Sequence, residues 1–306
     1  MDTRPLHRRF GVEIQGVDLR NVTAERHYPE IRALYERHSL LLFKNQEMDP
    51  DLHNDFALLF GPLEDRVADA AGTEPRTRPP VPRLSNLEKS GEGTMDAKSL
   101  HVLNLIANQY WHTDSTFLRR PALVNAITAY VVPSKGGETE IVSTRAAWQD
   151  LPQALKDKAE ETVFLHSVLP SRMDTDPRLL ELPEVNRYQG QAWRAVWLNP
   201  VTGEKALYIA NHIYGARGTD WGDARAFAEE LITFCTRPEY LYAHRWEPGD
   251  VLVWDERATM HRGQPWPYEE ERTLASTCAS ARDCDGLSLV TPADGPIRPE
   301  EVLKVA

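Results

Sequence analysis

The sequence predicts a mainly β fold, either a sandwich or a barrel, with helices packed around it. Seven short apolar segments have the composition of strands, and turns rich in glycine and proline separate them. Apolar residues at helical spacing occur in dispersed segments between those strands. A chain of 306 residues can bury roughly 75% of its extended-chain surface, so it needs no disulfide or structural metal to fold.

The N-terminal part alternates extended and helical segments. Residues 10–19 form a short extended piece with glycine turns, and apolar residues then recur at helical spacing over 28–35. The apolar run 39–43 predicts a buried strand. A capping aspartate and a first-turn proline, Asp49-Pro50, begin a second helix, which ends at Gly61-Pro62.

The segment from about 64 to 108 has a different character. Prolines, glycines and charged residues replace the periodic pattern there. A stretch of this length without clear elements inside a compact domain is usually a functional loop or a mobile lid. Because it leads directly to His112, we predict an active-site lid at about 64–108.

Strand signals accumulate in the rest of the chain. The predicted strands cover 123–132, 162–168, 195–198, 206–210, 240–246, 250–254 and 273–280. Helices are expected at 145–155 and 223–236, and the residues at about 169–193 form an insertion. No internal repeat or clean boundary divides the chain, so we expect a single domain over 1–306.

Composition limits the partners that the protein can have. The 35 basic and 46 acidic residues give a net charge of −11, which disfavours nucleic acid or an anionic membrane as the main partner. The three cysteines, Cys235, Cys278 and Cys284, are odd in number and form no CxxC pair, which is typical of reduced thiols in a cytoplasmic protein. No apolar run of about 18 residues predicts a membrane span. A homo-oligomer is compatible with all of this.

The most informative motif is Trp111-His112-Thr113-Asp114, together with the distant His261. A histidine and an aspartate two residues apart on an extended strand project from the same face, and the second histidine can complete a three-ligand set. Two imidazoles and one carboxylate leave three adjacent positions open, which non-haem Fe(II) uses for a chelating co-substrate and dioxygen. Zinc could also bind this set and serve a hydrolase.

Arg272 follows His261 by eleven residues and supplies the second part of the pattern. Its guanidinium could grip the far carboxylate of a dicarboxylate co-substrate, for which a hydrolase has no general need. Thr139, after Gly136-Gly137, could donate a hydroxyl to the same carboxylate. The alternatives are an ordinary arginine at a strand end and a β-branched residue that begins a strand.

With these motifs the chain resembles the Fe(II)/2-oxoglutarate-dependent dioxygenases of the taurine dioxygenase and 2,4-dichlorophenoxyacetate dioxygenase family. The resemblance runs from Phe10 to about Ala281. It implies a double-stranded β-helix (jelly-roll, cupin-like) core, Fe(II) held by His112, Asp114 and His261, and 2-oxoglutarate bound by Arg272 and Thr139. It also implies consumption of O2, release of succinate and CO2, and hydroxylation or oxidative ether cleavage of a small organic acid. The matching motifs lie at 60–64, 111–117, 133–139, 246–250 and 254–255.

The phenoxyacetate branch looks closer than the taurine branch. Ser276 stands where the taurine enzyme has a sulfonate-binding arginine. Residues expected at the substrate, each with a purely structural alternative, are Arg66 as the replacement anion clamp, Asn108, His166 and His212. An aryloxy- or alkyl carboxylate is the first expectation for this small anionic substrate. An alkyl sulfonate or sulfate is the second, and an amino-acid-derived or natural-product substrate is the third.

Two non-dioxygenase classes stay open from the sequence. One is the zinc hydrolase, and the other is a non-catalytic metal-binding jelly roll. Iron-dependent release of succinate from 2-oxoglutarate distinguishes the dioxygenase from both.

Overall fold

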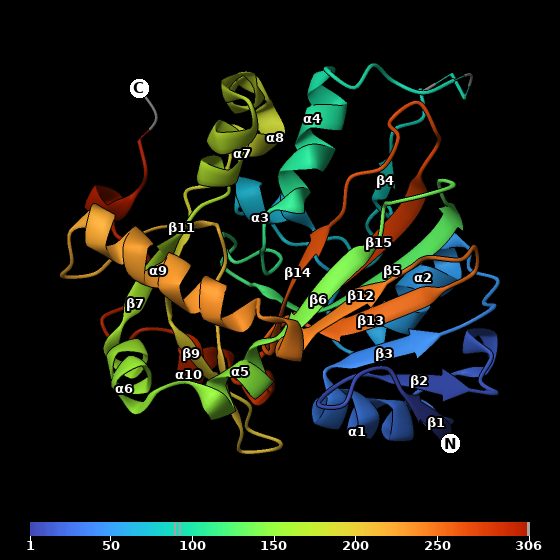
Figure 1. Ribbon diagram of the computed structural model, residues 1–306, viewed down its shortest axis with the longest axis horizontal. Helices are drawn as coiled ribbons and strands as arrows, with labels where there is room; N and C mark the ends of the chain where they lie inside the picture. The colour runs from blue at the N-terminus through green and yellow to red at the C-terminus, as the bar shows by residue number, and fades with distance from the viewer. Residues whose placement is uncertain (89, 92, 305–306) are drawn as a thin grey trace.

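β-Sheets organise the part of the chain that the computed structural model describes, residues 1–88, 90–91 and 93–304 (Figure 1). The largest sheet has the strand order β1 (Asp2–Pro5), β2 (Val12–Gln15), β3 (Leu40–Phe43), β13 (Val251–Asp255), β5 (Ala122–Val131), β15 (Thr273–Ser280), β4 (Arg83–Ser85). Two smaller sheets have the orders β12 (Leu241–His244), β6 (Thr139–Ser143), β14 (Thr259–Gly263) and β11 (Ile213–Ala216), β7 (Val163–His166), β8 (Gln191–Arg194). A further pair joins β9 (Val196–Leu198) to β10 (Lys205–Leu207). Pairing is antiparallel except between β2 and β3.

Helices cover the sheets and connect them. The α-helices are α1 (Tyr28–His38), α2 (Pro50–Leu58), α3 (Arg66–Ala71), α4 (Leu100–Ile106), α5 (Thr144–Asp150), α6 (Gln153–Glu161), α7 (Leu169–Thr175), α8 (Pro183–Asn186), α9 (Trp221–Cys235) and α10 (Leu287–Val290). Short 3-10 turns are η1 (Leu19–Asn21), η2 (Ala107–Gln109), η3 (Pro177–Glu181), η4 (Pro238–Tyr240), η5 (Asp283–Asp285) and η6 (Pro299–Glu301). None of the helices in these described ranges combines the length and the apolar composition that a membrane crossing requires.

Strand β3 shows how the large sheet is stabilised on both faces. Successive strand residues point to opposite faces, so Leu41 and Phe43 join one apolar cluster while Leu40 and Leu42 join another. Helices α1 and α2 pack into the first cluster, and the second contains Ile141 from β6. The large sheet and the β12-β6-β14 sheet therefore share one buried layer. The continuous apolar run at 39–43 is the expected signature of a strand buried on both sides.

The prediction of a mainly β protein with flanking helices is confirmed. Each predicted strand overlaps an observed one, and β13 is paired on one side with β3 and on the other with β5. The predicted helix at 145–155 is wrong in its extent, since it is two helices, α5 and α6. Leu151 and Pro152 separate them, because proline lacks an N–H and disfavours helical backbone at the residue before it.

The segment 64–108 contains more structure than its composition indicated. It forms α3, β4 and α4, and both helices begin with capping side chains, from Asp65 to the Ala68 N–H and from Ser99 to the Val102 N–H. Asp65 and Ser99 are residue types that commonly cap helices, so the sequence did contain a signal for these two helices. In Figure 1, α3 and α4 lie at the same end of the molecule as α7 and α8 of the insertion, and α4 contacts α7.

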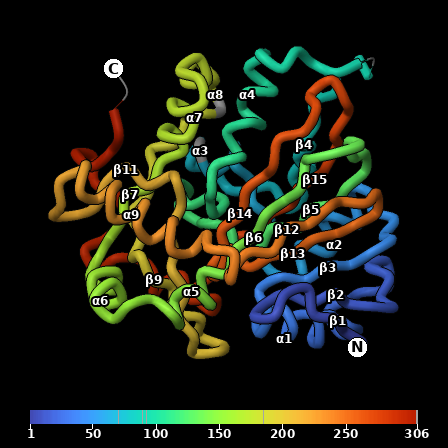
Figure 2. Tube along the Cα trace, viewed as in Figure 1, coloured from blue at the N-terminus to red at the C-terminus, as the bar shows by residue number. Residues whose placement is uncertain are grey.

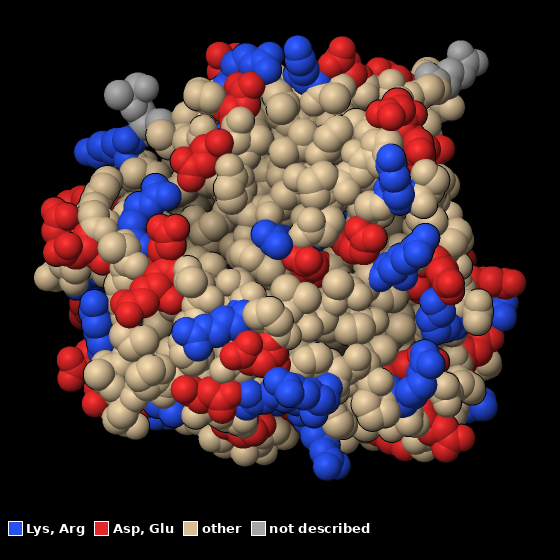
Figure 3. Space-filling view, viewed as in Figure 1, with Lys and Arg blue, Asp and Glu red and all other residues tan. Residues whose placement is uncertain are grey.

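The remaining helices cover the other half of the fold. Helix α9 packs across β11, as the tube in Figure 2 shows. It shares an apolar cluster with α5 and β7. The face drawn in Figure 3 has lysine and arginine interspersed with aspartate and glutamate, with no continuous basic area on that face.

Candidate metal and co-substrate site

The two histidines of the motif are held opposite each other by backbone pairing. His112 N–H donates to the His261 carbonyl at 3.0 Å, and His261 N–H donates to the His112 carbonyl at 2.8 Å. Residues directly opposite in an antiparallel pair project from the same face, and the two imidazole centres lie 4.2 Å apart. One backbone bridge between His112 and β14 therefore brings together two histidines that are 149 positions apart in the sequence.

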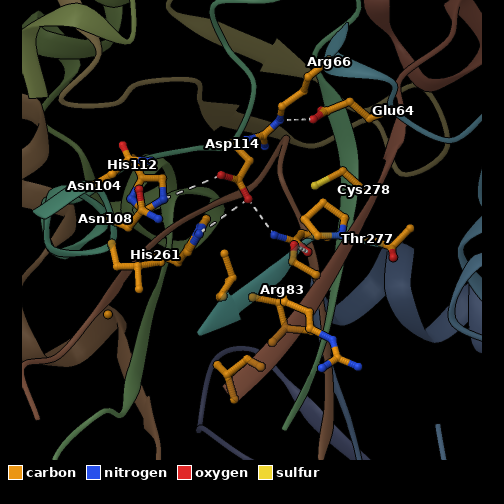
Figure 4. A pocket seen from close by; sticks show the side chains of 18 of the residues that line it. Glu64, Arg66, Arg83, Asn104, Asn108, His112, Asp114, His261, Thr277 and Cys278 are labelled. Carbon is orange, nitrogen blue, oxygen red and sulfur yellow. Dashed lines mark hydrogen bonds and ion pairs between the residues drawn. The ribbon is translucent and has the colours of Figure 1, made fainter. Parts of the chain in front are cut away.

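Asp114 completes the group from the same segment. Its Oδ1 lies 3.6 Å from His112 Nε2 and its Oδ2 lies 3.7 Å from His261 Nε2 (Figure 4). Asn125 of β5 donates to Asp114 Oδ2 at 2.6 Å, and Ser276 of β15 donates to the Asn125 carbonyl oxygen at 2.8 Å. This chain of hydrogen bonds orients the carboxylate from the large sheet.

The ionisation of the group suits a divalent cation. Burial lowers the pKa of His261 to about 3 and also lowers the pKa of His112, so both rings are neutral at pH 7. Burial acts to raise the pKa of Asp114, but His261, His112, Arg66 and the Asn125 amide outweigh it and hold that pKa below its ordinary value. The result is two neutral imidazoles and one carboxylate.

The tautomer of His112 points its free nitrogen into the group. The Tyr110 carbonyl accepts from His112 Nδ1 at 2.8 Å, which leaves the Nε2 lone pair facing Asp114. One donor atom from each of His112, Asp114 and His261 lies within 4.8 Å of the others. Neutral nitrogen donors and one carboxylate are the ligand set that non-haem Fe(II) takes, so these residues fit the metal.

A second carboxyl group, Glu256, lies behind Asp114 and was missed from the sequence. Its Oε2 accepts the Asp114 backbone N–H at 2.9 Å, and its Oε1 accepts the Trp254 indole N–H at 2.6 Å. Burial, then the nearby Asp114 charge, raises the pKa of Glu256 well above its ordinary value. This shift favours the protonated form of Glu256, in contrast to Asp114, whose pKa is lowered.

Arg272 lies at the wall of the same pocket. Its Nε and one terminal nitrogen donate to the Gly137 carbonyl at 3.3 and 3.1 Å, and the guanidinium lies 5.1 Å from the Trp266 ring centre. No carboxylate within the described ranges pairs with it. Burial lowers its pKa to about 10, so it is a buried cation without an anion.

The turn before β6 depends on two glycines. Gly136 and Gly137 have φ of +70° and +73°, which favours glycine. A Cβ on Gly137 would lie 3.1 Å from Arg272 Nε, and one on Gly136 would lie 2.3 Å from the Pro265 carbonyl oxygen. Thr139 follows at the start of β6, with its Oγ1 accepting from the Trp246 indole at 3.0 Å.

These groups share one cavity of about 460 Å³, a size that suits small-molecule ligands. Eight of the nine residues predicted for the site line it, and His166 does not. The eight are Arg66, Asn108, His112, Asp114, Thr139, His212, His261 and Arg272. His166 is fully buried on β7, neither ring nitrogen has a hydrogen-bond partner among the described residues, and Tyr208 is a ring neighbour.

The substrate-side residues differ in how they are engaged. Arg66 forms an ion pair with Glu64 and donates to Ser115 Oγ at 3.3 Å; its side chain is 46% exposed. His212 shares a hydrogen bond of 3.2 Å with Thr116 Oγ1 and lies beside the His112 ring. Asn108 accepts from Arg172 at 3.1 Å. Arg172 also lines the cavity, but it lies in the 169–193 insertion, where no sequence pattern marked it.

Comparisons with known proteins agree with this geometry. Residues 2–278 match the family model described as taurine catabolism dioxygenase TauD, TfdA family. The chain is 32% identical to the α-ketoglutarate-dependent 2,4-dichlorophenoxyacetate dioxygenase of Cupriavidus pinatubonensis, covering 88% of this chain and 94% of that protein. It is 30% identical to an α-ketoglutarate-dependent sulfate ester dioxygenase of Pseudomonas putida, covering 85% and 83%. The crystal structure of AAD-2 in complex with Mn(II) and N-oxalylglycine superposes with a TM-score of 0.83, at 28% identity over 92% of this chain and 98% of that one.

Proposed function

The chain belongs to the TauD/TfdA family of 2-oxoglutarate-dependent dioxygenases, and from that membership we propose that it oxidises an aryloxy- or alkyl carboxylate. It is an enzyme that uses Fe(II), 2-oxoglutarate and O2. The observation that carries the proposal is the convergence of two neutral histidines, an ionised aspartate and a buried unpaired arginine on one cavity.

His112, Asp114 and His261 are the proposed metal ligands. Bound Fe(II) supplies the activation of dioxygen, for which protein side chains have no equivalent. The chain's own contribution is to hold both imidazoles neutral by burial and to orient Asp114 through Asn125. Its buried surroundings also exclude water from the reacting groups.

Arg272 and Thr139 are the proposed partners of the 5-carboxylate of 2-oxoglutarate. A buried guanidinium without an anion is costly, and a carboxylate at this position would neutralise it with two parallel hydrogen bonds. The Thr139 hydroxyl, which accepts from Trp246, can direct its own hydrogen to the same carboxylate.

The apolar part of the cavity supports an aryl or alkyl body for the substrate. Leu105, Phe117, Ile127 and Leu274 line it together with the polar groups. The dichlorophenoxyacetate dioxygenase relative acts on an aryloxy carboxylate, as its name states. Oxidation at the carbon that bears an ether oxygen gives a hemiacetal, which collapses with cleavage of the ether.

A sulfate ester is the second candidate substrate, favoured by the similarity to the Pseudomonas putida enzyme. Succinate formation from 2-oxoglutarate tests both candidates. The assay compares purified protein with Fe(II) and either 2,4-dichlorophenoxyacetate or hexyl sulfate. Stimulation by the carboxylate supports the first candidate, stimulation by the sulfate alone supports the second, and no succinate under any condition contradicts the dioxygenase assignment.

We propose that the large sheet and the β12-β6-β14 sheet are the two faces of a double-stranded β-helix in a single domain. Their shared apolar layer supports this topology, as do their contributions to the triad, which are His261 on β14 and the Asn125 hydrogen bond from β5 to Asp114. The segment 64–108 is proposed as the lid over the cavity, because Arg66, His101 and Leu105 from it line that cavity. The insertion at 169–193 is proposed to complete the substrate pocket.

A cytoplasmic location and a small-molecule partner are also proposed. The cysteines are free, two of them buried, which suits a reducing compartment. The net charge of −11 and the interspersed charges in Figure 3 support the absence of nucleic acid and anionic membrane partners. Self-association stays a prediction.

A further inference from the structure

Arg172 on α7 extends toward helix α4 and the 3-10 turn η2 that follows it. Its Nε donates to the Asn104 carbonyl oxygen at 3.0 Å, and a terminal nitrogen donates to the Asn108 carbonyl oxygen at 3.1 Å. Another terminal nitrogen donates to Ser171 Oγ at 3.0 Å. Because guanidinium can only donate, both asparagines must present their carbonyl oxygens to it and turn their amide N–H groups elsewhere.

The charge of Arg172 is not neutralised. Two other arginines of the cavity have carboxylate partners, Arg66 with Glu64 and Arg76 with Asp65. No carboxylate forms an ion pair with Arg172 in residues 1–88, 90–91 and 93–304. Burial lowers the pKa of Arg172 to about 10, which still leaves the group charged at neutral pH.

Arg172 belongs to the cavity that holds the proposed metal ligands. Arg172, Asn104 and Asn108 line it together with His112, Asp114 and His212. In the view of Figure 4, Asn104 and Asn108 lie with His112 on one side of Asp114, and Arg66 with Glu64 lies on the other. Arg172, which is bonded to both asparagines, therefore borders the cavity that contains the proposed metal ligands.

Two anions must enter the cavity if the proposed function holds, the co-substrate and the substrate. Arg272 is buried and Arg172 is half-buried, and neither forms an ion pair with a carboxylate of the described residues. Arg272 is assigned to the co-substrate. We propose that Arg172, held by Asn104 and Asn108, binds the anionic group of the primary substrate, a carboxylate or sulfate. The inference rests on the proposed function and names the anion site within it.

The hydrogen-bonding capacity of this group suits an oxyanion. Guanidinium has five N–H donors, and three are used by Asn104, Asn108 and Ser171. Two N–H groups of Arg172 stay available, together with the asparagine amides. The position expected from the resemblance is occupied differently, since Ser276 donates to Asn125 and supports Asp114.

Substrate binding to variants tests the assignment. The probes are 2,4-dichlorophenoxyacetate, its neutral amide and hexyl sulfate, titrated calorimetrically into anaerobic protein with Fe(II) and 2-oxoglutarate. Arg172→Met should weaken the better-binding anion by about 30-fold or more, as loss of one partner of a desolvated charge pair does. The amide should change by less than about threefold, since it forms no charge pair. Arg172→Lys should bind the anion with an affinity between those of the wild type and Arg172→Met, because lysine keeps the charge but lacks the bidentate guanidinium.

Arg178→Met is the matched control. Arg178 belongs to the same insertion, is paired with Asp176 and is 56% exposed, so its loss should leave anion affinity unchanged. Arg66→Met tests the competing arginine. A loss of anion affinity in Arg66→Met with none in Arg172→Met would overturn the proposal. A merely structural role for Arg172 would weaken the acid and the amide alike, and that outcome also counts against it.

The wild-type protein gives a result that does not depend on variant folding. It should bind the acid or the sulfate more tightly than the amide by at least about tenfold, and equal affinity or no anion binding would refute the inference. Succinate formed from 2-oxoglutarate without any substrate reports the reaction class separately. Anion binding therefore tests the role of Arg172, and succinate formation without substrate separately tests the proposed function.

Discussion

At the scale of single residues, burial and neighbouring groups determine which side chains of the site are charged. Burial keeps His112 and His261 neutral at pH 7, while the two histidines, Arg66 and the Asn125 amide together hold the pKa of Asp114 below its ordinary value. Glu256 accepts the Asp114 backbone N–H at 2.9 Å, and its burial, followed by the charge of Asp114, raises its pKa well above its ordinary value. The cluster therefore offers a divalent cation one carboxylate charge and two nitrogen lone pairs.

The first prediction concerns the proposed metal ligands. His112→Ala and His261→Ala should each abolish stoichiometric Fe(II) binding and succinate formation, because two remaining protein ligands hold the metal poorly. Anaerobic calorimetry and a succinate assay measure both effects. His101→Ala, at an exposed histidine outside the triad, should keep Fe(II) binding. Full activity in either triad variant would show that the ligands are misassigned.

The second prediction concerns the co-substrate. Arg272→Ala should raise the apparent KM for 2-oxoglutarate by about 30-fold or more, since losing one partner of a buried charge pair costs on the order of 2–5 kcal/mol. Arg272→Lys should restore part of this, because lysine keeps the charge without the bidentate fork. Steady-state kinetics give both values. A change below about threefold in the alanine variant would rule out the assigned role.

At the scale of elements, turns and bridges set the positions of the side chains. The Gly136-Gly137 turn aims β6 so that Thr139 and the Gly137 carbonyl meet the pocket wall, and the carbonyl orients Arg272. The bridge between His112 and His261 joins the 112 segment to β14. In both features the conformation of the backbone determines where the side chains lie.

The third prediction tests the turn. Gly137→Ala should raise the KM for 2-oxoglutarate, because the added Cβ would lie 3.1 Å from Arg272 Nε and displace the guanidinium. Gly203→Ala is the matched control, since Gly203 has nearly the same φ of +72° but no neighbour within 4 Å of an added Cβ. Both variants should lose similar stability from backbone strain. Equal KM values in the two variants would contradict the role of Gly137.

The fourth prediction concerns β7. Burial lowers the pKa of His166 to about 3, below the ordinary value of about 6.5 for an unfolded chain. Between these values the unfolded state binds the extra proton, so stability rises with pH in this window and is lost as the solution is acidified. From pH 7.5 to pH 5 this residue alone should cost about 2 kcal/mol of unfolding free energy.

His166→Phe should remove that share of the pH dependence. Urea unfolding of the metal-free protein at the two pH values measures it, and the variant should lose about 2 kcal/mol less than the wild type on acidification. Identical pH dependence in the two proteins would mean that the His166 ring titrates normally in the folded state.

At the scale of the whole molecule, the site lies where separate layers meet. The large sheet supplies Asn125 and Ser276, the smaller sheet supplies Thr139 and His261, and the helical end of the molecule supplies Arg172 (Figure 1). The cavity is thus lined in part by segments that the sheets do not include. Substrate preference should therefore change with the proposed lid and the insertion, while the proposed metal site stays the same.

The fifth prediction follows from that division. Taurine should stimulate little or no succinate formation, because an uncharged serine, Ser276, stands where the resemblance places the sulfonate-binding arginine of the taurine enzyme, and its hydroxyl is engaged by Asn125. Ser276→Arg is not expected to create taurine activity by itself, since it also removes the Ser276 hydrogen bond to Asn125, the residue that orients Asp114. A succinate assay with taurine checks this, and robust taurine turnover by the wild type would disprove it.

The sequence by itself determined the reaction chemistry and most of the strands. The chemistry requires particular residue types, and the HxD motif, a distant histidine and Arg272 supply them. Strands are recognisable because their burial produces alternating or continuous apolar runs. The tertiary structure alone decided which groups meet in the cavity. Strand register brings Asn125 there, and the packing of α7 on α4 accompanies the arrival of Arg172. Glu256 lies behind Asp114, and His166 lies buried on β7 outside the cavity. Such contacts join residues far apart in the chain. No local sequence pattern predicts them, because the packing of sheets and helices in the folded protein stabilises them.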